Sequence, residues 1–221
     1  MSRIEMFSKF IASNISKNLS VDNEQEEVIA YGAFALIQTM ISILAVAVFG
    51  IIFDVLLESL LISFSAATLR KFSGGAHATA PMSCALIGMF VFGVQALFVK
   101  HFIINFSLTH LLLIMIAAFT FVFYIMFKYS PVGSANKPLK KEAVRRRLKR
   151  QSISYVIFLL LVNVVLTAIY IKIKNICLVS AASCITAGIV WQSVTLVSQG
   201  HLIIETLDKA LRGTISARRT N

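Results

Sequence analysis

Charged side chains are scarce in this sequence. They make up 14% of its 221 residues, whereas 57% of the residues are hydrophobic. A soluble globular domain usually carries about 25% charged residues. Because the apolar residues are gathered in long runs, the composition excludes an ordinary soluble domain. It predicts an all-α, polytopic membrane protein that forms one integral membrane domain over residues 1–221, with no room for a second, soluble one.

Acidic residues and cysteines are also few. Ten Asp and Glu stand against 21 Lys and Arg, which gives a formal net charge of +11. In a membrane protein such an excess sets the orientation and contacts anionic lipid, so membrane lipid is an expected partner and nucleic acid is not. The three cysteines are an odd number without framework spacing, so no disulfide is implied. The first 28 residues contain no continuous apolar run, and no cleavable signal peptide is expected.

Hydrophobic runs predict about six membrane-spanning helices, four within residues 28–127 and two within residues 153–197. The expected spans cover residues 28–53, 55–69, 82–99, 106–127, 153–171 and 176–197. The second span has only about 15 residues, short of the roughly 20 that a helix needs to cross the hydrocarbon. Arg70 and Lys71 follow it, and they extend it if their side chains snorkel to the interface.

Amphipathic segments flank these spans. Residues 1–22 place apolar side chains at helical spacing, and two roles stay open for them: lying on the membrane surface, or covering other helices of the protein. Asn23 and Glu26 resemble a capping box at the start of the first span. The tail, residues 201–221, is amphipathic and basic.

A basic loop over residues 128–151 determines the expected orientation. It carries nine Lys and Arg residues against the single acid Glu142. Since Lys and Arg concentrate on the cytoplasmic side, this loop, residues 70–84 and both termini are expected to be cytoplasmic. The turns near Asp54 and at residues 100–105 then lie outside.

Residues 70–84 interrupt the apolar first half of the chain, and they hold His77 and Cys84 seven residues apart. A cysteine attacks a carbonyl group as its thiolate, and a neighbouring histidine can accept the proton. On one straight helix, seven residues give about 10.5 Å of rise, which is too far for a hydrogen bond. The break needed to bring the two side chains together is supplied by Gly74-Gly75 and by Pro81.

Pro81 suits the first turn of a helix, so Thr79 or Ala80 is the expected N-cap, and Thr79 is the better residue type. Cys84 then falls in the first turn of the third span. The alternative is that Cys84 is a small membrane residue and His77 a polar interfacial one. Two ligands do not complete a zinc site, so no metal is expected.

Three other residues that could take part in a reaction lie outside this segment. Glu58 lies one turn inside the second span, where a carboxyl group faces protein or water, or carries a proton. Cys177 and Cys184 are also seven residues apart, but they belong to a plain apolar helix with no base nearby. Packing is the role expected for both.

Two motifs together resemble a known family. Residues 70–77 read Arg-Lys-Phe-Ser-Gly-Gly-Ala-His and are followed by Cys84, and residues 130–139 read Ser-Pro-Val-Gly-Ser-Ala-Asn-Lys-Pro-Leu. The first is similar to the signature of the accessory gene regulator B (AgrB) family, which are bacterial membrane endopeptidases that process quorum-sensing propeptides. The second is similar to the proline-containing loop of that family. The order of the motifs, the chain length and the number of hydrophobic segments fit as well.

The resemblance implies a cysteine endopeptidase with Cys84 as nucleophile and His77 as general base, without a cofactor. The implied substrate is an AgrD-type propeptide, cut between its signal segment and its C-terminal tail and cyclised to a thiolactone or lactone. A homodimer is the assembly that the resemblance implies. The competing interpretation is a small transporter or exporter with an incidental Cys and His, although the chain lacks paired discontinuous helices.

Several residues have supporting roles in this interpretation. Backbone N–H groups near Ser83 and Cys84 are expected to stabilise the oxyanion. Arg70 and Lys71 are either interfacial anchors or groups that bind the acidic propeptide tail or steady the site. An attraction for that tail is also expected from three neighbouring residues of the basic loop: Arg145, Arg146 and Arg147.

Overall fold

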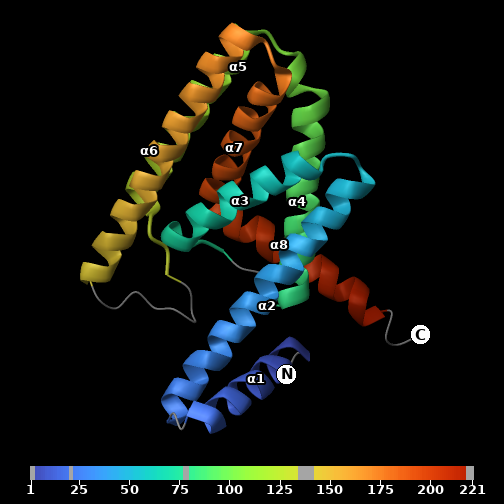
Figure 1. The fold of residues 1–221 in the computed structure, drawn as a ribbon, viewed down its shortest axis with the longest axis vertical. Helices are drawn as coiled ribbons and strands as arrows, with labels where there is room; N and C mark the ends of the chain where they lie inside the picture. Colours follow the sequence, from blue (N-terminus) through green and yellow to red (C-terminus); the bar gives the residue numbers. More distant parts are fainter. Residues whose placement is uncertain (1–2, 20–21, 77–79, 134–141, 218–221) are drawn as a thin grey trace.

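The computed structural model describes residues 3–19, 22–76, 80–133 and 142–217. Over this part, the chain folds into eight α-helices and one short 3₁₀ helix (Figure 1). In chain order they are α1 (Arg3–Leu19), α2 (Asn23–Ile52), α3 (Leu56–Ser73), α4 (Pro81–His101), η1 (Ile103–Asn105), α5 (Leu108–Tyr129), α6 (Glu142–Ile173), α7 (Ile176–Val194) and α8 (Ser198–Ala217). The all-α class expected from the composition is confirmed.

Five of these helices are long and apolar enough to cross a membrane: α2, α4, α5, α6 and α7. About six spans are expected from the sequence, and one of them is not among these five helices. The difference is α3, which has 18 residues and includes the charged residues Glu58, Arg70 and Lys71. Figure 1 shows α3 running obliquely across α4 and α7, against which it packs. The polytopic architecture is confirmed, with α3 as a shorter helix inside it.

The central helix of the bundle is α7. The most apolar 18-residue stretch of α7 is 61% buried, whereas the corresponding stretches of the other four candidate spans are 17–28% buried. It packs against α3, α4, α5 and α6. Ile185 and Ile189 join one hydrophobic cluster with residues of α3, α5 and α6, whereas Cys184 joins a second cluster with residues of α2, α3 and α4. The packing role expected of Cys184 is therefore confirmed.

Connections between the helices gather at two ends of the bundle. At one end, the Lys100 ammonium binds the Asp54 carboxylate at 2.8 Å, which joins the α2–α3 turn to the end of α4. At the other end, the Val132 N–H donates to the Ser73 carbonyl at 2.9 Å. The α2–α3 turn and the end of α4 therefore lie at one end of the bundle, and the segments after α3 and α5 lie at the other. The charge pattern predicts this arrangement. Which end faces the cytoplasm stays a prediction.

An antiparallel hairpin joins α1 to the first half of α2 (Figure 1). The buried side chains of α1 include Ser8, Ala12 and Ser16, four residues apart. Small residues at this spacing let two helices approach closely. Phe7 and Phe10 remain 56% and 65% exposed. Thus α1 covers protein with one face and keeps apolar side chains available for lipid with another.

Two helix boundaries differ from expectation. The N-cap of α2 is Asp22 and not Asn23, because the Asp22 carboxylate accepts the Gln25 N–H at 2.7 Å. A carboxylate caps as well as an amide and adds a full negative charge at the positive end of the helix. In addition, α6 begins at Glu142, inside the segment expected to be a basic loop. Arg and Lys are good helix formers, so charge alone does not keep this segment out of a helix.

Candidate active site

Cys84 lies in the first turn of α4, as the sequence predicts. Ala80 is the N-cap and Pro81 is the first helical residue. Of the two residues expected as the N-cap, Thr79 and Ala80, the structure has Ala80, because the fixed φ of Pro81 starts the helix directly after it. The Cys84 side chain is neither buried nor fully exposed. His77 and Thr79 lie outside the described residues, so contact between His77 and Cys84 stays a prediction.

The backbone of Cys84 corrects one expected role. Its N–H donates to the Ala80 carbonyl at 3.1 Å and is therefore already used within the first turn of α4. An N–H that is bonded in this way cannot also stabilise an oxyanion without breaking that bond. Ser83 is 1% exposed, and a role for its backbone N–H stays a prediction.

Arg70 brings a positive charge close to Cys84. It lies in the last turn of α3, and its Nη2 donates to the carbonyl oxygen of Ala76. Burial lowers the pKa of the Arg70 guanidinium, whereas the charge of a Cys84 thiolate raises it. A cation beside the sulfur is typical of reactive cysteines. The next residue, Lys71, is exposed, which fits an interfacial anchor.

The two sequence motifs lie against each other in space. Gly74 and Val132 form a single parallel bridge. Gly74 has φ +71°, and a Cβ at this residue would overlap the Val132 carbonyl oxygen. Gly75 has φ +128°, and its Cβ would stand 2.7 Å from Thr195 Oγ1. Gly74 is thus required by the close approach of the Val132 backbone, and Gly75 by its positive φ and by the nearby side chains of Thr195 and Gln192, and not only as a flexible break.

Sequence reasoning missed two residues that hold this segment, one near the end of α7 and one directly after it. Gln192 is 1% exposed, and its Nε2 donates to the Gly74 carbonyl at 2.7 Å and to Ser73 Oγ at 3.1 Å. The Thr195 carbonyl accepts the Ala76 N–H at 3.1 Å. A glutamine inside an apolar run signals a buried group that needs partners. The sequence does not say which partners, because they lie 118 and 119 residues away along the chain.

Glu58 is not brought to Cys84 by the fold. It lies in the first turn of α3, whereas Arg70 lies in the last, 12 residues later. This separation corresponds to about 18 Å along a helix. Glu58 instead lies near the α2–α3 turn, at the end of the bundle where Lys100 binds Asp54.

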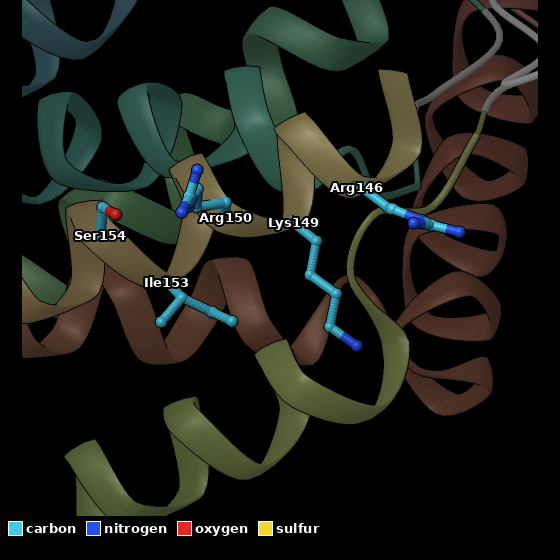
Figure 2. A pocket seen from close by; sticks show the side chains of 5 residues that line it. All are labelled: Arg146, Lys149, Arg150, Ile153 and Ser154. Atoms are coloured by element: carbon cyan, nitrogen blue, oxygen red, sulfur yellow. The ribbon is translucent and has the colours of Figure 1, made fainter. Parts of the chain in front are cut away.

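Arg145, Arg146 and Arg147 form part of an exposed basic surface at the start of α6. Arg146 pairs with Glu142 at 2.5 Å. A hollow of about 310 Å³ on this surface is lined by Arg146, Lys149, Arg150, Ile153 and Ser154 (Figure 2). The three cationic side chains point in different directions (Figure 2), so they do not converge on one ligand. The surface therefore favours diffuse attraction of an anion over a built binding site.

Matches to known proteins cover nearly the whole chain. The family model described as accessory gene regulator B matches residues 8–196. The chain belongs to the AgrB family. Two proteins of Clostridium perfringens, from strains SM101 and 13 and provisionally named AgrB-like, are each 35% identical over 206 residues, which cover 93% of this chain and 96% of theirs. A provisionally named AgrB-like protein of Listeria innocua is 26% identical over 76% of this chain and 78% of its own. No solved structure matches the chain.

Membership of the AgrB family implies involvement in the agr quorum-sensing system. The AgrB match includes both motifs and the end of α7, which are the parts of the bundle that meet around residues 73–76. The match stops before α8, which packs against α4. The family model therefore covers the bundle that holds residues 73–76.

Gln192→Leu is expected to loosen residues 73–76 while keeping a side chain of similar volume. The change removes the Gln192 donor from the buried Ser73 hydroxyl and from the partly buried Gly74 carbonyl, which keeps only the longer bond from Ser73 Oγ at 3.3 Å. A buried group left unsatisfied costs about 1–3 kcal/mol. Hydrogen–deuterium exchange of the protein in nanodiscs should show faster exchange in the peptide that contains these residues. Ser193→Ala is the matched control, because the buried Ser193 hydroxyl donates only within its own helix, to Ile189. Equal exchange in Gln192→Leu and the unchanged protein would contradict this role.

Proposed function

We propose that this chain is a membrane cysteine endopeptidase that removes the C-terminal tail of an AgrD-type quorum-sensing propeptide, with Cys84 as nucleophile and His77 as general base. The observation that carries the proposal is the position of Cys84, in the first turn of α4 beside Arg70, in a member of the AgrB family. A partly exposed thiol next to a cation suits attack on a carbonyl group. Backbone N–H groups near Ser83 are the proposed oxyanion donors.

The proposed reaction has two acyl-transfer steps. The Cys84 sulfur attacks the carbonyl carbon between signal segment and tail, the C–N bond breaks, and the proton that His77 took from the thiol passes to the amine of the leaving tail. The signal segment is then held as a thioester. A Cys or Ser within that segment attacks the thioester carbonyl, which closes a thiolactone or lactone ring and returns the proton to Cys84. Exchange between two thioesters is nearly balanced in free energy, so exclusion of water from the thioester preserves the activated acyl group.

The proposed site lies at the cytoplasmic boundary of the bacterial cell membrane. Residues 73–76 share one end of the bundle with the basic start of α6, since the Val132 N–H bonds Ser73 and the Ser130 hydroxyl bonds Ser152 on α6 at 3.1 Å. A basic segment is retained on the cytoplasmic side. A newly made propeptide would arrive on that side.

His77→Ala is expected to lower the rate of tail release by about 10²- to 10⁴-fold, the usual contribution of a general base. The measurement uses the full chain in liposomes, a synthetic AgrD-type propeptide, and chromatography of the released tail. His110→Ala is the control, because His110 is exposed and bonds Ser107 at the start of α5. Tail release by His77→Ala at the unchanged rate would contradict the assignment of the base.

Neutralising the start of α6 tests the attraction of the acidic tail. The variant carries Arg145→Gln, Arg146→Gln and Arg147→Gln, and its kcat/KM is expected to fall by about 3- to 10-fold at low salt, since steering by charge acts over roughly a Debye length. The difference should shrink at 0.5 M salt, where the charges are screened. Membrane insertion is checked by protease accessibility. If the variant matches the unchanged protein at both salt concentrations, the basic surface does not attract the propeptide.

A further inference from the structure

Two buried polar atoms near the first turn of α4 have no hydrogen-bond partner among the described residues. They are Oε1 of Gln38, on α2, and Nε of Arg70, at the end of α3. Buried polar atoms in folded proteins are nearly always paired, so each exception needs an explanation. One of these atoms is an acceptor and the other is a donor.

Gln38 reaches α4 from the neighbouring helix. Its Nε2 donates to the Pro81 carbonyl at 2.7 Å, although 43 residues separate the two along the chain. The contact also determines the orientation of the amide, because a rotated side chain would turn its oxygen toward the carbonyl oxygen of Pro81. Residues three apart on a helix are neighbours on its surface, so Pro81 and Cys84 lie on adjoining parts of the same turn. The amide of Gln38 is thus held next to the turn that carries Cys84.

Arg70 approaches the same turn from α3. Its Nη2 donates to the Ala76 carbonyl, and its guanidinium is close to Cys84. Nε is left as a buried donor. Among the described residues around Cys84, one acceptor and one donor therefore have no partner. Such a pair is the complement of the C=O and N–H groups of a peptide main chain.

We propose that Gln38 and Arg70 bind the main chain of the substrate beside the scissile bond. Gln38 Oε1 accepts a backbone N–H, and Arg70 Nε donates to a backbone carbonyl oxygen. The substrate class is an extended peptide, recognised at this point through its backbone and independently of its side chains. This inference rests on the proposed peptidase function and adds Gln38 as a substrate-binding residue.

The test compares backbone changes in the substrate with a change in the protein. A series of synthetic AgrD-type propeptides replaces one backbone N–H at a time by an ester oxygen, at the residues within three of the scissile bond. Each is cleaved by the unchanged full chain in liposomes, by Gln38→Leu and by Gln95→Leu. Gln95 is the matched control, because its Oε1 is also buried without a partner among the described residues, but it lies 11 residues beyond Cys84, about 16 Å along the helix.

One ester is expected to lower kcat/KM by about 3- to 10-fold with the unchanged protein, the effect of one hydrogen bond. Gln38→Leu should lose a similar factor with the all-amide propeptide, chiefly through a higher KM, and should lose nothing more with that ester. Gln95→Leu should keep the full effect of the ester. If the ester lowers the kcat/KM of Gln38→Leu by the same factor as that of the unchanged protein, the two losses are independent and the proposal is overturned.

The ester series with the unchanged protein keeps the proposal testable if Gln38→Leu does not fold. If no ester lowers kcat/KM, no backbone N–H near the scissile bond is bound and the proposal is wrong. If the unchanged protein cleaves normally and only the comparison with Gln38→Leu fails, the peptidase assignment stands without this role for Gln38. If the unchanged protein releases no tail from any propeptide, the peptidase assignment fails and this inference fails with it.

Discussion

Cys84→Ala is expected to lower the release of the propeptide tail by at least about 10³-fold, to the level of the background reaction. Loss of a nucleophile removes the covalent pathway itself and not only a contact, which is why such variants lose most of their catalysis. The side chain lies in the first turn of α4 and is partly exposed, so its truncation should leave the fold intact. Tail release is measured in liposomes, together with the amount of inserted protein.

The other two cysteines are the controls for Cys84. Cys177 is exposed at the start of α7, and Cys184 is buried in the hydrophobic cluster that includes residues of α2 and α4. Cys177→Ala and Cys184→Ala are expected to release the tail at rates close to that of the unchanged protein. A Cys84→Ala variant that still releases tail at a comparable rate would show that another group is the nucleophile.

Gly74→Ala is expected to have a large effect on tail release, although Gly74 takes no part in the chemistry. Gly74 has φ +71° and ψ −148°, a region that is essentially restricted to glycine. An added Cβ would also overlap the Val132 carbonyl oxygen. The backbone must therefore shift, at a cost of about 1–3 kcal/mol for the strained conformation alone. Because residues 73–76 lead toward His77, we expect tail release to fall by roughly 10²-fold or more, as misplacement of catalytic groups by 1 Å can cost about that much.

Gly32→Ala is the matched control for Gly74→Ala. Gly32 lies within α2, and an added Cβ there meets nothing within 4 Å. Alanine is favoured over glycine in a helix by about 1 kcal/mol, so this variant should be at least as stable as the unchanged protein and equally active. Thermal unfolding in detergent and tail release are measured for both variants. Equal activity of Gly74→Ala and Gly32→Ala would contradict the role given to the contact between Gly74 and Val132.

Much of the fold follows from local rules that act on the sequence. Apolar runs of sufficient length identify the helices that can span a membrane. Pro81 after Ala80 predicts the start of α4 and so the position of Cys84 in its first turn. The charge pattern predicts that the turns after α3 and α5 share one end of the bundle, and the bridge between Gly74 and Val132 bears this out.

Other features depend on tertiary contacts that local rules do not specify. Hydropathy marks residues 55–69 as apolar but does not show that α3 crosses the bundle obliquely, because the direction of a helix is set by its packing. Gln192 and Gln38 are visible as polar residues in apolar runs, whereas their partners, Gly74 and Pro81, lie far away along the chain. The Asp22 cap shows a smaller difference of the same kind, since two adjacent residues both suit the N-cap and the geometry selects one.

The central claim is that Cys84 forms a thioester with the signal segment of the propeptide. The most direct test is intact-protein mass spectrometry after rapid acid quenching of the full chain mixed with a propeptide whose internal Cys or Ser is replaced by alanine, which prevents cyclisation. The predicted result is a mass increase equal to that of the propeptide without its tail, located at Cys84 by fragmentation and removed by hydroxylamine. No such adduct on the protein while free tail accumulates, or an adduct at another residue, would contradict the claim.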